Sequence, residues 1–253
     1  MLTRYLPLLV CLFALPACGG AIYAPARTAG FQLDDPREID DDDIAKAFLA
    51  RPQLGDELRV AYYVFDENHA AEVEAMLDAA PAVVSTYRIP SLMVTGERRL
   101  DPRHPYATPE RKPVRLKQLR LLAARARADV LVVVDYGYEV SKEANGWAAL
   151  GAAALVPLLF VPWLDVEVKS YVDSYVIDVR NGFLYGHLTT EQEGEETQQT
   201  VHSDVDETLI ESQLEVLLAQ TQARLAKLVA DQRNQLKAPA AREDGEPLAQ
   251  TTR

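Results

Sequence analysis

The residues near the start of the chain that could do chemistry are its cysteines, whose thiols are strong nucleophiles. Cys18 follows an apolar run, Tyr5–Leu15, and Arg4 is the only charged residue before that run. A short positive start, an apolar middle and small residues at the exit form the layout of a secretory signal peptide. The run is too short for a helix that spans a bilayer, which needs about 20 residues. The sequence therefore predicts a secreted protein with a thiol at the signal-peptide exit.

The residues around this thiol are Leu15-Pro16-Ala17 before it and Gly19 after it. This pattern resembles the lipobox of bacterial lipoproteins. The resemblance implies cleavage before Cys18, diacylglycerol on its thiol and a further acyl chain, such as palmitate, on the new amino group. Two or three acyl chains form a lasting anchor, whereas one holds a protein only marginally. By the family's rule, Gly19 in place of an aspartate favours the outer membrane. An ordinary signal peptide with an incidental cysteine is the alternative.

Catalytic and metal-binding patterns are absent from the rest of the sequence. The other cysteine, Cys11, leaves with the signal, so no thiol remains for a disulfide or a zinc site. The histidines have no HxH or HExxH spacing; they are His69, His104, His187 and His202. There is also no GxSxG nucleophile elbow and no phosphate-binding loop. We therefore expect no catalytic residue, no metal and no cofactor.

One carboxylate is placed where an α/β enzyme could use it. Asp135 lies at the end of a predicted buried strand, the Val-rich run within Asp129–Val140, although a turn cap or an arginine partner is the favoured interpretation. The net charge is −12, and acidic side chains are abundant. A periplasmic hydrolase that uses acidic residues is therefore the alternative function. This charge excludes nucleic acid as a partner and excludes membrane binding by charge alone.

The chain divides into a signal peptide, an acidic linker, one folded domain and a tail. We predict these as residues 1–17, 18–55, 56–237 and 238–253, with a solvated acidic spacer at Asp34–Asp43. The hydrophobic content of 48% is that of a globular domain. The tail has the composition of a disordered segment.

The elements predicted for the domain alternate between strands and helices. The strands are Leu58–Phe65, Val83–Val94 (broken at Pro90), Asp129–Val140, Val166–Val179 and Phe183–Thr190; the helices are His69–Ala80, Val114–Ala128 and Asp204–Leu236. The Val-rich strand Asp129–Val140 is apolar enough for burial on both faces. This order predicts a single α/β domain, with α+β as the alternative, built on a mixed sheet packed by helices and ending in a long C-terminal helix.

Two connections carry specific predictions. Asn181-Gly182 is a strong hairpin signal and predicts a two-residue turn with positive φ at both positions. The polar stretch Glu191–Ser203 is predicted as a loop. The apolar stripe Ile210–Leu228 of the last helix could pair with another copy, although packing on its own sheet is the more common arrangement.

The stretch from the Ala-Asp before the Val-rich strand to the hairpin resembles a small α/β domain of several bacterial lipoproteins. These are the curli-secretion channel lipoprotein, the amino-terminal domain of TolB and the rhombotarget lipoproteins. The hairpin motif of those families is matched by Asp178, Gly182 and Gly186. The resemblance covers about Asp56–Leu236 and implies an assembly or scaffolding role at the outer membrane, with no catalytic residue.

An apolar insertion at residues 144–164 separates two predicted strands. No charged residue lies between Glu143 and Asp165, and the only tryptophans of the chain bracket the run. A transmembrane helix, a buried part of the core and a contact surface are the three interpretations. Pro157 and Pro162 count against a continuous transmembrane helix. For the third interpretation the contact residues are Trp147, Leu150, Leu155, Phe160 and Trp163.

These patterns together predict a membrane-anchored bacterial envelope lipoprotein that faces the periplasm. Its role would be non-enzymatic docking, assembly or scaffolding through the insertion. The predicted partners are the membrane, through lipid on Cys18, and either further copies of the chain or another envelope protein.

Overall fold

The computed structural model describes residues 21–23, 40–95, 114–144, 164–198 and 205–237. The strands are β1 Ala21–Tyr23, β2 Leu58–Val64, β3 Val83–Arg88, β4 Val130–Ala144, β5 Leu164–Asp178 and β6 Leu184–Gln198. The helices are α2 Asp41–Leu49, α3 Ala70–Asp78, α4 Ser91–Thr95, α5 Leu116–Arg125 and α7 Val205–Lys237, and a 3₁₀ turn spans Glu67–His69. The signal peptide, Cys18, most of the predicted insertion and the predicted tail lie outside the described residues.

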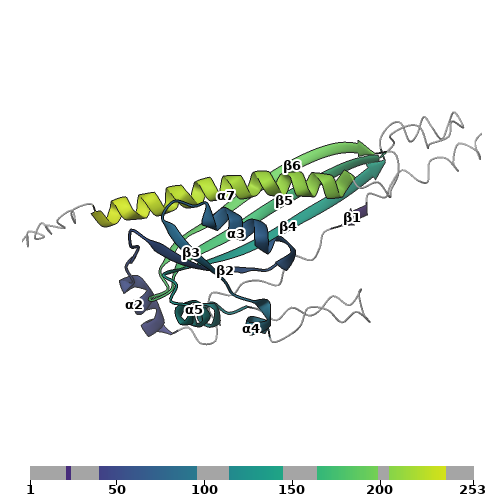
Figure 1. Ribbon diagram of the computed structural model, residues 1–253. Helices are drawn as coiled ribbons and strands as arrows, with labels where there is room; N and C mark the ends of the chain where they lie inside the picture. Colours follow the sequence, from purple (N-terminus) through teal and green to yellow (C-terminus); the bar gives the residue numbers. More distant parts are fainter. Residues whose placement is uncertain (1–20, 24–39, 96–113, 145–163, 199–204, 238–253) are drawn as a thin grey trace, which may run out of the picture.

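The sheet is mixed and has the order β3-β2-β4-β5-β6. β1 pairs with β4 on the edge that also carries β2, further along the strand. β2 is parallel to β3 and β4, whereas β5 and β6 are antiparallel to their neighbours. α3 and α7 cover one face, and α5 covers the other (Figure 1). The predicted α/β domain with a mixed sheet and a long C-terminal helix is therefore confirmed.

β4 is the central strand because its first half is apolar on both sides. Val130, Val132 and Val134 pack toward α3 and α7, and Leu131 and Val133 pack toward α5. All five are at most 3% exposed. Burial of a strand on both faces is expected when helices cover both sides of a sheet, as the Val-rich sequence predicted.

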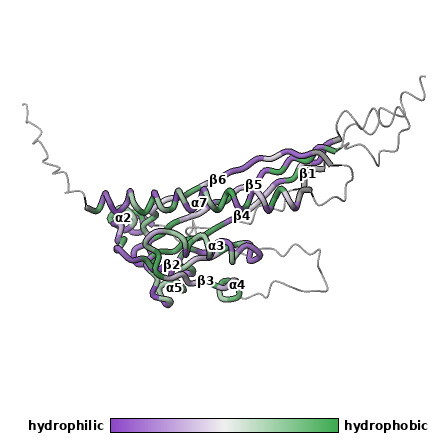
Figure 2. The backbone as a smooth tube through the Cα atoms, turned by 45° about the horizontal axis from the view of Figure 1, so that its top comes forward, coloured by the Kyte–Doolittle hydropathy of each residue, from purple (hydrophilic) through white to green (hydrophobic). Residues whose placement is uncertain are grey.

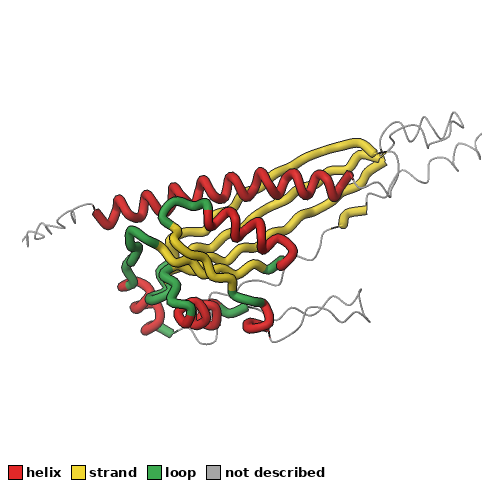
Figure 3. Tube along the Cα trace, viewed as in Figure 1, coloured by secondary structure: helices red, strands yellow, loops and turns green. Residues whose placement is uncertain are grey.

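Three strands extend well beyond the rest of the sheet. β2 pairs with β4 only up to Val134, whereas β4 pairs with β5 as far as Ala144 (Figure 3). The remaining ten residues of β4 correspond to about 34 Å of extended strand. We call residues 135–144 of β4, 164–173 of β5 and 189–198 of β6 the arm. The free end of the arm, at Ala144 and Leu164, is the distal end. The opposite end of the domain is the proximal end.

α7 runs along the arm and covers one of its faces (Figures 1 and 2). The buried residues of its apolar stripe are Leu214, Leu217, Leu218 and Leu225. Gly186 lets the helix approach, because a Cβ there would lie 3.1 Å from Leu228. A polar contact also joins the layers, since Gln213 accepts from Ser170 at 2.6 Å and donates to the Val168 carbonyl at 3.0 Å. The stripe therefore packs on its own sheet and is not available for pairing with another copy.

Two sequence predictions for local structure are wrong. The predicted strand to Val94 ends at Arg88, because Pro90 interrupts it and α4 follows. The predicted loop from Glu191 is instead a continuation of β6, which stays paired with β5 as far as Gln198. Its side chains are polar because β6 is an edge strand with one face in solvent, and edge strands tolerate charge.

The connection between β5 and β6 confirms a hairpin but not a two-residue turn. Five residues separate the strands, and of the predicted pair only Gly182 has a positive φ, at 77°. The Asp178 carboxylate accepts from the backbone N–H groups of Arg180 and Asn181 at 2.8 and 3.2 Å, which favours a wider loop. The Asn181 side chain is also engaged, because its amide donates to the Arg51 carbonyl at 2.6 Å.

Replacing Gly182 by valine should lower the free energy of unfolding by about 1–3 kcal/mol. A β-branched side chain is strained at this φ, and its Cβ would lie 2.8 Å from the Arg120 guanidinium. Gly182→Asn is the matched control, since asparagine tolerates the left-handed region and should lose less stability. Urea unfolding of the three proteins checks this; equal midpoints for all three would contradict it.

Candidate functional site

The distal end is the point where the apolar insertion leaves and re-enters the sheet. Ala144, at the end of β4, pairs directly with Leu164, at the start of β5. Both bounds of the predicted insertion are therefore paired strand residues, and residues 145–163 connect two adjacent strand ends. The five predicted contact residues, Trp147, Leu150, Leu155, Phe160 and Trp163, all lie outside the described residues.

The amino-terminal segment meets the sheet at the same end. β1 pairs antiparallel with β4, with Ala21 opposite Lys142 and Tyr23 opposite Val140. This stretch belongs to the predicted linker 18–55, within which the structure forms both β1 and α2. Cys18 precedes β1 by three residues and lies outside the described residues.

The distal end has a small apolar core of its own. Val140, Val166 and Val168 are at most 2% exposed and pack with the partly buried Leu209 and Ile210 of α7. These contacts come from the arm and from the first turns of the long helix. The described strands of the distal end are therefore packed by α7.

The face of the arm opposite α7 is strongly acidic. Its acidic residues are Asp135, Glu139 and Glu143 of β4, Asp165, Glu167 and Asp173 of β5, and Glu191, Glu193 and Glu195 of β6. Lys169 lies among them, 2.8 Å from Glu167 and 3.5 Å from Glu193. Its ammonium lowers the pKa of the Glu167 carboxyl, and the two glutamates raise the pKa of Lys169. Asp135 is thus a mid-strand residue of this face, not the end of a strand as predicted.

Three solved structures to which this chain is similar are distant likenesses. No family model matches the chain, and no curated protein matches it. A PelC dodecamer from Paraburkholderia phytofirmans is 12% identical, with a TM-score of 0.30, and the match covers 84% of this chain and 99% of that one. Lipoprotein GNA1162 from Neisseria meningitidis is 12% identical, with a TM-score of 0.28, over 63% and 97%.

A third likeness is to the hypothetical protein CT253 from Chlamydia trachomatis. It is 11% identical, with a TM-score of 0.32, over 69% of this chain and 99% of that one. Likenesses of this size define neither a family nor a function for this chain.

One histidine of the acidic face has neighbours that invite comparison with a catalytic triad. His187 Nε2 lies 3.3 Å from Asp173 Oδ1 and 3.4 Å from Thr189 Oγ1, and its ring stacks on Tyr175. In a triad the nucleophile and the acid meet opposite nitrogens of the ring. Here both meet Nε2, and the threonine hydroxyl donates to the carboxylate at 2.6 Å. This arrangement orients the histidine on the sheet but does not activate Thr189.

The described strands and helices hold neither a metal-site arrangement nor a membrane-crossing helix. Among residues 40–95, 114–144, 164–198 and 205–237, no group of three or more His, Cys, Asp or Glu side chains is arranged to hold a metal ion. Within the same part of the chain, no helix combines the length and the apolar character needed to cross a membrane.

The residues of the hairpin motif are structural. The Asp178 carboxylate is 1% exposed and accepts from the Tyr185 hydroxyl at 2.6 Å. Burial and this acidic neighbour raise the pKa of Tyr185. The same hydroxyl accepts from the Gln53 backbone N–H at 3.0 Å. The motif therefore fixes the β5–β6 turn and attaches residues 51–53 to the proximal end.

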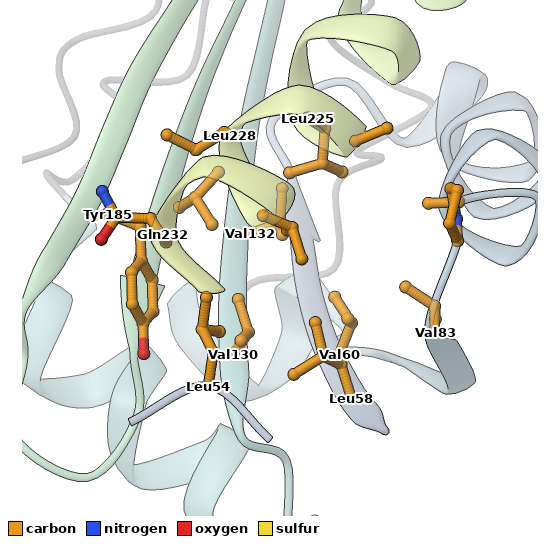
Figure 4. A pocket seen from close by; sticks show the side chains of 15 residues that line it. Leu54, Leu58, Val60, Val83, Val130, Val132, Tyr185, Leu225, Leu228 and Gln232 are labelled. Carbon is orange, nitrogen blue, oxygen red and sulfur yellow. The ribbon is translucent and has the colours of Figure 1, made fainter. Parts of the chain in front are cut away.

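The recess beside this motif is apolar. It lies between the second half of α7 and the proximal sheet and has a cavity volume of about 20 Å³, room for about one water molecule. Leu58, Val132, Leu225 and Leu228 are among its lining residues, and the amide of Gln232 points away from its centre (Figure 4). A recess without converging polar groups offers nothing for catalysis.

Sequence reasoning missed the convergence of the two ends of the insertion with β1. The acidic face was also missed, because three of its residues, Glu191, Glu193 and Glu195, lie in a stretch predicted as a loop. The two-residue periodicity of Glu191, Glu193 and Glu195 was the signal that could have indicated a strand.

Proposed function

We propose that the protein is a lipid-anchored envelope protein whose distal end faces the membrane and docks there through the apolar insertion. The contact is with the membrane interface or with a protein embedded in it. The role is non-enzymatic: the protein holds its proximal end at a defined distance from the bilayer. The envelope is that of a bacterium, and the outer membrane, facing the periplasm, is the proposed location.

The position of β1 is the observation that carries this proposal. Ala21 is held opposite Lys142 at the distal end. The three residues back to Cys18 can span at most about 11 Å. Lipid on Cys18 would therefore bring this end of the molecule to the bilayer surface, where residues 145–163 also leave the sheet. An apolar segment beside an acyl anchor is in reach of the membrane interface, where tryptophan side chains are favoured.

The shape of the domain supports a spacer or scaffolding role. The arm accounts for about 34 Å of strand beyond β2, and α7, with 33 residues, is about 50 Å long. A domain anchored at the distal end would present α5 and the β5–β6 turn to partners away from the membrane. The acidic face of the arm supports an upright orientation, because anionic headgroups would repel it.

The two tryptophans test this orientation directly, because both belong to the insertion. We expect bromine-labelled phospholipids to quench their fluorescence when the lipidated protein is reconstituted in vesicles. The matched control is Trp147→Phe/Trp163→Phe/Phe183→Trp, which moves the probe to the proximal end. Its emission should not be quenched. Equal quenching of the two proteins, or none in either, would contradict the proposal.

A further inference from the structure

The helix α2 displays an apolar surface that no described residue of its own chain covers. Ile44, Phe48 and Leu49 are 59%, 87% and 71% exposed, and no residue of the helix is buried. Asp40 caps its start by accepting from the Asp43 N–H at 2.8 Å. A helix of nine residues is marginal by itself in water, because most helix stability comes from packing of an apolar face. Among the residues that the structure describes, this helix therefore lacks the packing partner that its sequence is suited to.

α2 is also held in place rather than trailing from the domain. The Arg51 carbonyl, two residues beyond the helix, accepts from the Asn181 side chain at 2.6 Å. The Gln53 N–H donates to the Tyr185 hydroxyl at 3.0 Å. These contacts are with the β5–β6 turn and the start of β6, so α2 lies at the proximal end (Figure 1). Phe48 nevertheless remains exposed, so the α5 of the same chain does not take up the helix.

The exposed side of α5 and α4 carries apolar side chains with cations beside them, which complements the apolar and acidic surface of α2. Leu121 is 54% exposed, and Lys117 and Arg125 lie one turn to either side of it on α5. On α4, Leu92 and Met93 are 53% and 55% exposed. The two helices are joined on this side, because the Gln118 side chain donates to the carbonyls of Met93 and Val94.

The charges of the two surfaces are opposite. The stretch Asp40–Asp43 contains four consecutive acids at the start of α2. The stretch Arg115–Arg127 contains five cations and no acid. Lys117 and Arg125 flank Leu121, whereas Arg120 donates to the Val179 and Arg180 carbonyls of the β5–β6 turn. Attraction between the two surfaces across an interface would fix the orientation of the docked helix and exclude like-charged partners.

We infer that α2 of one copy of this chain docks on the α4–α5 surface of a second copy. Apolar side chains meet at Phe48 and Leu121, and the acids of α2 face the cations of α5. Every copy carries one helix and one receiving surface, so the contact is head-to-tail and builds a ring or an open chain of copies, or a dimer by mutual exchange. A nine-residue helix is about 13 Å long and buries much less than the roughly 800 Å² per partner of a standard interface. One contact alone is therefore weak, and two contacts per copy give the assembly its stability.

Disulfide trapping between two differently tagged full-length chains tests this inference. One chain carries Phe48→Cys and the other Leu121→Cys, and both are expressed in the same cells. We expect an oxidant to yield a cross-linked species that carries both tags. The control replaces Leu121→Cys by Val216→Cys, which is 44% exposed on α7 and outside the proposed surface. A doubly tagged yield no higher than in this control, or cross-links of Phe48→Cys only to other proteins, would overturn the inference.

Charge reversal gives an independent measurement on the same assay. Lys117→Glu/Arg125→Glu in the receiving chain should lower the cross-linked yield about tenfold. Asp41→Lys/Asp42→Lys in the helix donor should restore most of it. Failure of the second pair to restore the yield would overturn the charge complementarity. Because this surface lies at the proximal end, its failure is distinguishable from failure of the distal docking proposal.

Discussion

Replacing Cys18 by alanine is expected to abolish lipid labelling of the protein and to leave it as a longer precursor. The thiol is the atom that would receive diacylglycerol, and no other residue at the exit of the apolar run can form the same thioether. Loss of two or three acyl chains removes a free energy of membrane binding of about 0.8 kcal/mol per buried methylene. Radiolabelled or alkynyl palmitate, with gel mobility as the measure of processing, checks the result.

The second cysteine provides the control for this experiment. Cys11 lies inside the apolar run of the predicted signal peptide, so Cys11→Ala should leave labelling and processing unchanged. Palmitate incorporation in Cys18→Ala equal to that of the unchanged protein would refute the lipid anchor. In that case no acyl chain would hold the distal end at the bilayer.

Deletion of Trp147–Trp163 is expected to leave the domain folded and to remove its docking. The structure makes this deletion simpler than the sequence suggested, because Ala144 and Leu164 are directly paired. Removing the segment leaves Asn145-Gly146 between these two residues, which is the preferred sequence for a two-residue hairpin turn. β4 and β5 should therefore join without any added linker. The expected readouts are a near-unchanged melting temperature and loss of membrane or partner contact when the acyl chains are also absent.

The opposite outcome has a clear signature. If the insertion belongs to the core, many apolar side chains would be lost at about 1.5–3 kcal/mol each, which exceeds the whole stability of a typical domain. The deletion variant would then be unfolded by circular dichroism. A matched variant, in which a Gly-Ser chain of equal length replaces Trp147–Trp163, separates loss of apolar contact from loss of loop length. Docking retained by both variants would rule out the insertion as the docking surface.

Regular periodicity explains which elements could be predicted from the sequence. The Val-rich run of β4 and the apolar stripe of α7 are long and continuous, so neighbouring residues repeat the same signal. The loop predicted for the second half of β6 was wrong because the glutamates of this edge strand point to solvent. A polar edge strand resembles a loop in sequence. The predicted two-residue β5–β6 turn was wrong because the Asp178 side chain, which precedes the predicted pair, accepts hydrogen bonds from the N–H groups of the turn.

The sequence by itself determined the candidate anchor, the α/β class and the presence of an apolar insertion, because each depends on residues that are close in the chain. Only the tertiary structure decided where these features lie relative to one another. The pairing of Ala21 with Lys142 joins residues far apart in sequence, and it is this pairing that places β1 beside both ends of the insertion. The exposure of α2 likewise depended on the packing of every other element. Backbone pairing between distant strands leaves no local signature, since any β-strand can hydrogen-bond to any other.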